Sequence, residues 1–228
     1  MITLYQFPTS PFSEKVRRIL NFKQVAFIVH DVPRARVAEY ARVSPTGKFP
    51  AIDHDGTPVW DSTDIAHHLE RAFPEPALIP ASGPERGLVH ALEDWADESL
   101  YFYEMTMRLA WEHNVGRVLP AFLATMPGLD EAQARTLITE SVGKLTTTQG
   151  LGRKPRTQIT EDAARHFRAI DDLLSGGDWL VGGRITLADI AVAAQVAALL
   201  YAEECMRIVA DLPRVQAWIA RVDTVAPA

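Results

Sequence analysis

The spacing of hydrophobic residues changes early in the chain. Ile2–Phe7 is rich in β-branched and aromatic residues and predicts a strand, which the prolines at positions 8 and 11 end. The apolar residues then recur at helical spacing. The predicted helical stripe consists of Phe12, Val16, Ile19, Leu20 and Lys23, with Lys15, Arg17 and Arg18 mostly on the opposite, solvated face. Because Ser10 precedes Pro11, the pair suits an N-cap and a first helical residue.

Further strands follow this helix. Val25–Val32 reads as a strand, and Arg34–Arg42 as a helix or turn. Phe49-Pro50 opens the next strand, since a proline without an N–H suits a strand start or edge. Asp55-Gly56 is a two-residue hairpin signal, because both residue types accept positive φ, and Thr57–Trp60 is the return strand.

A second helix is predicted directly after the hairpin. Asp61–Asp64 carries small oxygen-bearing side chains just before the helically spaced Ile65, Leu69 and Phe73. The order β-α-β-α-β-β-α is that of a thioredoxin-like α/β domain.

Prolines at positions 74, 76, 80 and 84 then predict a linker, and the pattern beyond it is helical almost to the end. Thr186 and Asp189 form a capping box with Ile185 and Ile190 as its hydrophobic staple, so Asp189 is expected to be structural rather than catalytic. We therefore expect a thioredoxin-like domain over residues 1–76, a linker over 77–86 and an all-α domain over 87–228.

Composition narrows the function classes. The 228 residues are 47% hydrophobic and 23% charged, as in ordinary globular proteins, and the net charge of -6 does not favour nucleic acid or an anionic membrane. One cysteine, Cys205, excludes an intrachain disulfide. The longest apolar run, Ile190–Ala202, is shorter than a membrane span needs. We expect a cytoplasmic protein without a secretory signal, and no metal, since adjacent His67 and His68 diverge around a helix.

The stretch Ser44–Ile65, SPTGKFPAIDHDGTPVWDSTDI, resembles the glutathione site of the glutathione transferase superfamily. The resemblance implies a cis bond before Pro50. It also implies that the backbone of Phe49 pairs with the cysteinyl part of glutathione, and that Asp61 and Ser62 hold its γ-glutamyl end. An α-carboxylate suits the free N–H groups of a helix N-terminus. The alternative is a capped helix after an edge proline.

Two basic residues are candidates for binding the remaining part of glutathione. Lys48 either lies by the glycyl carboxylate or is solvated. Arg36 falls near a basic position of tau-like members, but a surface role is the better expectation for it.

Glutathione chemistry needs a thiolate, whereas a free thiol has a pKa of about 8.5. Lowering that pKa by about two units takes about 2.7 kcal/mol of preference for the anion. One hydroxyl donor to a charged sulfur supplies roughly 1.5–3 kcal/mol, and a helix N-terminus up to ~1 kcal/mol. Ser10, between the first strand and the first helix, fits this need.

Ser10-Pro11-Phe12 followed by a basic helix resembles the serine-type transferases, notably the plant tau class. Ser10 could instead only cap the helix. Tyr5 is a rival donor, offset by one residue from the family's usual tyrosine position, and Ser13 is a weaker one. No cysteine stands near Ser10, which argues against the cysteine-type branches, and the Ser-Ser-Cys signature of the zeta class is absent.

The resemblance places the second substrate against the first long helix after the linker. Aromatic and methionine residues crowd that stretch: Tyr101, Phe102, Tyr103, Met105, Met107 and Trp111. Such a wall suits a hydrophobic electrophile, although most such residues face a core or a partner. As lining residues we expect Phe12, Tyr103, Met107 and Trp111.

The helical half adds a second resemblance. Glu98–Trp111 and Gln149–Arg153, running on to Asp171–Leu174, are similar to the failed-axon-connections and metaxin-related branch of the same fold. Two readings follow. One is a glutathione transferase, homodimeric as the family implies, that activates glutathione for attack on a hydrophobic electrophile or peroxide. The other is a glutathione-binding or protein-interaction module without efficient chemistry.

Overall fold

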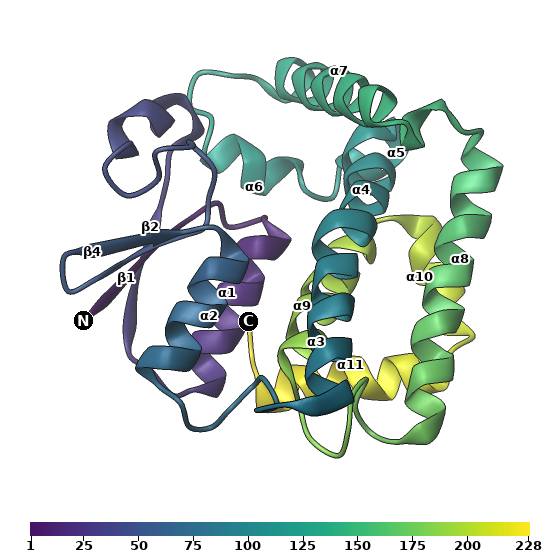
Figure 1. Ribbon diagram of the computed structural model, residues 1–228. Coiled ribbons are helices and arrows are strands. Elements are labelled where there is room, and N and C mark those ends of the chain that lie inside the picture. Colours follow the sequence, from purple (N-terminus) through teal and green to yellow (C-terminus); the bar gives the residue numbers. More distant parts are fainter.

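A four-stranded mixed sheet organises the N-terminal domain of the computed structural model, which describes all residues 1–228 (Figure 1). The strand order is β2-β1-β3-β4; β1 is parallel to β2 and antiparallel to β3, and β3 is antiparallel to β4. The elements are β1 (Ile2–Gln6), α1 (Pro11–Phe22), β2 (Phe27–Asp31), a 3-10 helix (Arg34–Tyr40), β3 (Ala51–His54), β4 (Thr57–Trp60) and α2 (Ser62–Ala72). The predicted thioredoxin-like order is confirmed.

The two faces of this sheet are covered differently. Leu4 and Ile52 are fully buried in the main core, which α1 and α2 share. Tyr5 points to the other face, where it packs in a small cluster with Tyr40 of the 3-10 helix. The hairpin is as predicted, with φ of 51° at Asp55 and 87° at Gly56.

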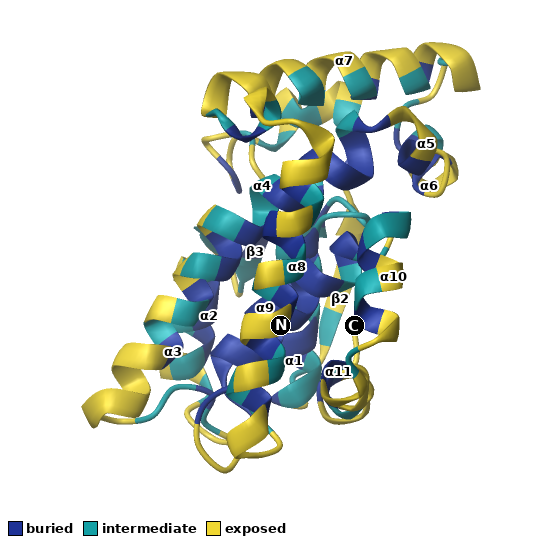
Figure 2. Ribbon diagram, turned by 90° about the vertical axis from the view of Figure 1, so that its right-hand side faces the viewer, coloured by how far each residue is buried: buried dark blue, intermediate teal, exposed yellow.

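The second domain is entirely helical (Figure 1). Its helices are α3 (Gly83–Trp95), α4 (Tyr101–Glu104), α5 (Glu112–Val115), α6 (Leu119–Ala124), α7 (Glu131–Gln149), α8 (Arg156–Leu173), α9 (Leu187–Leu199), α10 (Glu203–Ala210) and α11 (Pro213–Val225), with short 3-10 turns at Leu151–Arg153 and Leu174–Gly176. The nearly all-apolar α9 is the centre of the core and packs against α1 of the first domain. Figure 2 shows α7 at the periphery, exposed along most of its length.

The first helix of this domain begins within the predicted linker. α3 starts at Gly83, with Pro84 in its first turn, although we assigned residues 77–86 to the linker. Proline is compatible with a first helical turn, whose N–H groups have no intrahelical acceptor. Helical backbone then continues to Ala110 through two π-helical segments, Ala96–Leu100 and Met105–Ala110.

Asp189 has the structural role that its motif predicts. Its carboxylate is fully buried and accepts hydrogen bonds from the N–H of Thr186 at 2.9 Å, the N–H of Leu180 at 2.8 Å and Trp218 Nε1 at 3.0 Å. Ile185 and Ile190 are buried beside it. Burial raises the pKa of Asp189, and these donors oppose that rise. The box therefore joins the start of α9 to the chain before it and to α11.

The first helix does not have the solvated basic face that we expected. Lys15 is 1% exposed and Arg18 is 4% exposed. Arg18 pairs with Glu14 and Asp223 and donates to the carbonyl of Ala226, so the C-terminal end of the chain lies beside α1 (Figure 1). Lys15 lies four residues before Ile19 and therefore on the same side of the helix, at the edge of the apolar stripe. Its side chain is buried for this reason where the two domains meet.

A buried ion cluster forms around Lys15 where α1, α2 and α3 meet. The Lys15 ammonium contacts the carboxylate of Glu93, lies 2.6 Å from Asp97 Oδ2, and is 3.4 Å from Ser62 Oγ and 3.3 Å from Thr63 Oγ1. Burial raises the pKa of Asp97 to about 6, and the ammonium opposes the rise. This cluster is the polar tie between the two domains.

Replacing Asp189 by alanine should lower the free energy of unfolding by about 3 kcal/mol or more, because three buried N–H donors lose their acceptor. Asp130→Ala is the matched control, since Asp130 heads an exposed capping box on α7. It should cost only about 1 kcal/mol. Urea unfolding of both variants measures the two losses. Equal losses would contradict the structural role assigned to Asp189.

The raised pKa of Asp97 predicts a pH dependence of stability. Between about pH 4 and pH 6 the folded protein holds a proton that the unfolded chain has released, so this group lowers stability as the pH rises through that window. Asp97→Asn should therefore gain roughly 2–3 kcal/mol relative to wild type on going from pH 4 to pH 7. The exposed Asp94→Asn should show no such gain. Parallel pH profiles for Asp97→Asn and wild type in urea titrations would refute this assignment.

Candidate functional site

Ser10 lies where β1 ends and α1 begins. It is the N-cap residue of α1, with Pro11 at the start of the helix as predicted, but its side chain makes no capping hydrogen bond and none elsewhere in the chain. Its N–H donates to the carbonyl of Phe7 at 3.0 Å. A half-buried hydroxyl at a helix N-terminus is thus left free to donate to a ligand.

The loop before β3 contains one residue, Phe49, whose backbone groups are unpaired. The Phe49–Pro50 bond is cis, as the resemblance implied. The N–H and C=O of Phe49 take part in no hydrogen bond within the chain, and its ring lies 5.3 Å from that of Phe7. Ser44 Oγ donates to the carbonyl of Lys48 at 2.5 Å and so holds the loop. Since backbone polar groups are otherwise almost always paired, Phe49 is available to bind an extended peptide-like ligand.

The start of α2 completes this edge. Asp61 has φ of 74°, and its Oδ1 accepts from the N–H of Thr63 at 2.9 Å and of Asp64 at 3.4 Å. Asp61 Oδ2 has no partner within the chain. Ser62 is buried, and its hydroxyl lies against Lys15 and Asp97. The ion cluster therefore positions one of the two residues predicted to hold the γ-glutamyl end.

The two basic candidates have different surroundings. Arg36 is exposed and pairs with Glu39 on the same 3-10 helix, the surface position that we favoured. Lys48 is also exposed, and its ammonium has no carboxylate partner. Of the two, only the Lys48 side chain is uncommitted.

The rival hydroxyls are less accessible to a ligand than Ser10. Tyr5 packs between His30 and Tyr40 on the far face of the sheet. Ser13 is fully buried, and its hydroxyl has no partner. Gln6, at the family's usual tyrosine position, pairs with Asp31 and Arg17.

The residues expected to line the second-substrate site separate into two groups. The Phe12 ring lies 4.9 Å from that of Tyr101, and both residues are half-buried where the domains meet. Tyr103, Met107 and Trp111 belong to the core of the helical domain instead, with exposed fractions of 9%, 0% and 5%. A helix between two packed layers buries most of its aromatic side chains, and sequence spacing alone does not assign their faces.

Two arginines that contact the segment between β1 and α1, Arg34 and Arg108, were not identified from the sequence. Arg108, in the second π-helical segment, donates to the carbonyl of Thr9 at 3.1 Å and pairs with Glu104. A Glu and an Arg four residues apart inside an otherwise apolar stretch was the available signal. Arg34 stacks on the ring of Phe7, its guanidinium carbon 4.0 Å from the ring centroid. No local pattern marks Arg34 in the sequence.

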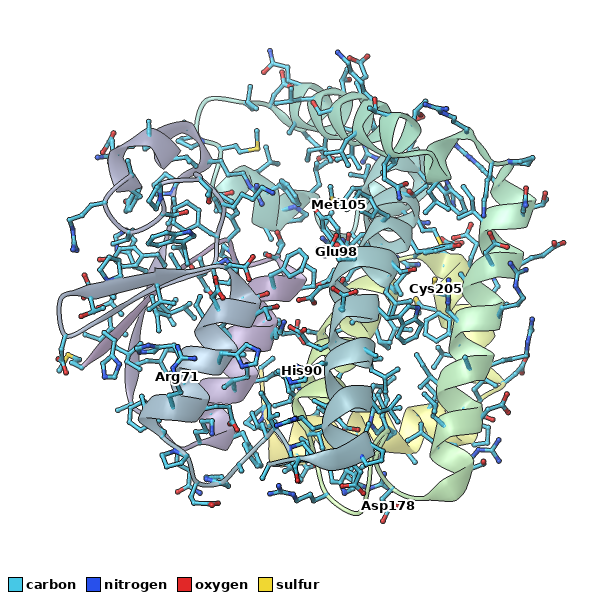
Figure 3. All side chains as sticks on the ribbon, in the orientation of Figure 1. Arg71, His90, Glu98, Met105, Asp178 and Cys205 are labelled. Atoms are coloured by element: carbon cyan, nitrogen blue, oxygen red, sulfur yellow. The ribbon has the colours of Figure 1, made fainter.

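Other reactive groups lie away from this site. Cys205 is fully buried, and burial raises the pKa of its thiol to about 12, so it is protonated at neutral pH. Figure 3 shows Cys205 within the helical domain, near α8. Glu98 and Met105 lie on the helical stretch that begins with α3 and ends at Ala110. No cluster of three or more His, Cys, Asp or Glu side chains is arranged to hold a metal ion. No helix combines the length and hydrophobicity that crossing a membrane requires.

Comparison with known proteins agrees with this geometry. Residues 4–77 match the family "Glutathione S-transferase, N-terminal domain" and residues 121–221 match "Glutathione S-transferase, C-terminal domain". The chain is 25% identical over 204 residues to FtsZ-localized protein A of Caulobacter vibrioides, covering 87% of this chain and 77% of that protein. It is 30% identical over 96 residues to a probable maleylacetoacetate isomerase of Drosophila melanogaster, 39% of each chain.

A solved structure shows the same fold over the whole chain. The glutathione S-transferase from Rhodospirillum rubrum has a TM-score of 0.70 and 24% identity, covering 98% of this chain and 88% of that one. Both domain matches, the cis-proline loop and the mixed sheet point to the same family. The chain belongs to the glutathione S-transferase superfamily.

Proposed function

We propose that the protein is a glutathione transferase in which Ser10 stabilises the thiolate of bound glutathione. The observation that carries the proposal is a pair of unsatisfied groups, the free Ser10 hydroxyl and the unpaired backbone of Phe49 before cis-Pro50. Phe7 links the two, because its carbonyl accepts the Ser10 N–H and its ring packs on that of Phe49. The backbone would hold the cysteinyl part of glutathione, and the hydroxyl would donate to its sulfur. One such donor and the N-terminus of α1 are enough to lower a thiol pKa by about two units.

We assign the remaining glutathione contacts to Lys48 and to the start of α2. Asp61 Oδ2 would accept a hydrogen bond from the γ-glutamyl ammonium. Ser62 and the N–H groups at the start of α2 would hold the γ-glutamyl carboxylate. The exposed Lys48 ammonium would meet the glycyl carboxylate. Arg36, already paired with Glu39, would contribute little.

The thiolate would attack a hydrophobic electrophile or a peroxide held against Phe12 and Tyr101. Burial, followed by the charge of Glu104, raises the pKa of Tyr101 to about 12, so its hydroxyl is neutral and can donate to a developing negative charge. No metal is required for this chemistry. A cytoplasmic homodimer is proposed on the family resemblance alone.

A second candidate is a module that keeps the fold without efficient chemistry. One relative aligned over 87% of this chain is named for localisation with FtsZ rather than for an enzymatic activity. Under this alternative the surface would bind a protein partner, and Ser10 would serve only as the residue before α1. Co-sedimentation of the protein with FtsZ polymers, unaffected by Ser10→Ala, would support this alternative.

Ser10→Ala should lower kcat/KM for conjugation of 1-chloro-2,4-dinitrobenzene about 10- to 100-fold, because the thiolate loses its hydroxyl donor. Glutathione affinity measured by calorimetry should change little, since backbone and α2 contacts remain. Ser13→Ala is the matched control, because it removes a buried hydroxyl one turn away. Unchanged turnover in Ser10→Ala, or no turnover by wild type, would contradict Ser10 as activator.

A further inference from the structure

Arg34 is a cation without a counter-ion at the boundary of the two domains. Its side chain is half-buried, pairs with no carboxylate and donates no hydrogen bond within the chain. Its Nε is buried and unpaired. Burial, followed by the repulsion of Arg108, lowers the pKa of Arg34 to about 10. Buried charges are normally paired, so an unpaired one needs an explanation.

The other arginines that are buried have partners. Arg18 pairs with Glu14, and Arg108 pairs with Glu104. Arg34 is held by stacking instead, with the Phe7 ring 4.0 Å and the Phe122 ring 4.5 Å from its guanidinium carbon. Both contacts are cation–π interactions, which leave the N–H donors of the guanidinium without an acceptor.

This guanidinium lies close to the proposed reaction centre. Arg34 stacks on Phe7, and the carbonyl of Phe7 accepts the N–H of Ser10. The N–H of Arg34 donates to the carbonyl of Thr125 at 3.1 Å, which ties the 3-10 helix to the end of α6. The side chain is therefore held between the domains, and Phe7 links it to the residue that carries the proposed activating hydroxyl.

A second guanidinium group, that of Arg108, lies near Arg34 at this boundary. Arg108 is near enough to repel Arg34, and Tyr101 is near enough to interact with it. The carboxylate of Glu104 is engaged by Arg108. An anion between the two guanidinium groups would remove their mutual repulsion and satisfy the free N–H donors of Arg34.

We propose that Arg34 binds a carboxylate carried by the electrophilic second substrate. The planar guanidinium edge matches a carboxylate in bidentate geometry. Such a substrate would place its apolar part against Phe12 and Tyr101. This inference rests on the proposed transferase function and narrows it from hydrophobic electrophiles in general to those that also bear a carboxylate.

Either of the two carboxylates of glutathione itself is the other possible source of this anion. Arg34 is stacked on Phe122 of α6 and interacts with Tyr101 and Arg108, all in the helical domain. The proposed glutathione contacts, Phe49 and Asp61, lie in the first domain. The helical-domain neighbours favour the second substrate.

A matched pair of product analogues tests the inference by binding alone. S-benzylglutathione and S-(4-carboxybenzyl)glutathione differ only by the carboxylate on the benzyl ring, and calorimetry measures the affinity of each for wild type, Arg34→Gln, Arg34→Lys and Arg42→Gln. Arg42 is a control of equal charge, since it is exposed and already paired with Asp53. Wild type should prefer the carboxybenzyl conjugate. Arg34→Gln should lower that preference roughly tenfold or more, Arg34→Lys should lower it partly, and Arg42→Gln should leave it unchanged.

Several results would overturn the inference. A preference that survives in Arg34→Gln, or is absent in wild type that binds both conjugates, would show that Arg34 does not bind this carboxylate. Equal weakening of both conjugates in Arg34→Gln would assign Arg34 to glutathione itself. If wild type binds neither conjugate, the proposed glutathione site fails and the inference with it. Arg34→Lys keeps the charge and the stacked stem, so it separates lost recognition from a misfolded Arg34→Gln.

Discussion

The buried ammonium of Lys15 is the interaction on which the arrangement of the site depends. It joins the first helix to the start of α2 and to the first helix of the second domain through Ser62, Glu93 and Asp97. Removing two carboxylates and an ammonium from water is costly unless each is paired, so the three helices meet in one defined geometry. The same helix begins at Ser10, and the same Ser62 begins α2. The ion cluster thus sets the position of both helix N-termini that would face glutathione.

The candidate site is recognised by groups that the fold leaves unsatisfied. The backbone of Phe49, the hydroxyl of Ser10 and the guanidinium of Arg34 lack hydrogen-bond partners within the chain. These groups run from the cis-proline loop, past the start of α1, to α6. A ligand with a peptide-like backbone, a thiol and an acid would satisfy all three.

Local patterns in the sequence predicted individual elements of both domains. The hairpin at Asp55-Gly56, the start of α1 at Pro11 and the box at Asp189 each depend on residues close in sequence, and the structure confirms them. Contacts between distant segments were not predictable in this way. Lys15 sits at the edge of an apolar stripe, and its carboxylates lie about eighty residues away. Met107 was assigned to the substrate site, although the fold buries it in a core.

The two domains also explain why Arg34 was not found from sequence. Its partners Phe7 and Phe122 come from different domains, so no local spacing in the sequence could bring both rings against one guanidinium. The cis bond at Pro50 was expected only through family resemblance, because its base rate in X–Pro bonds is low. Family resemblance suggested the reaction class, and tertiary packing determined which side chains remain without partners.

The central claim is that bound glutathione is a thiolate because Ser10 donates to its sulfur. A pH titration of the thiolate absorbance of glutathione bound to wild type and to Ser10→Ala tests it most directly. The account predicts a thiol pKa about two units below the free value in wild type and a return toward about 8.5 in the variant. An equally low pKa in both proteins would assign activation to another group, and an unshifted pKa in wild type would contradict activation altogether.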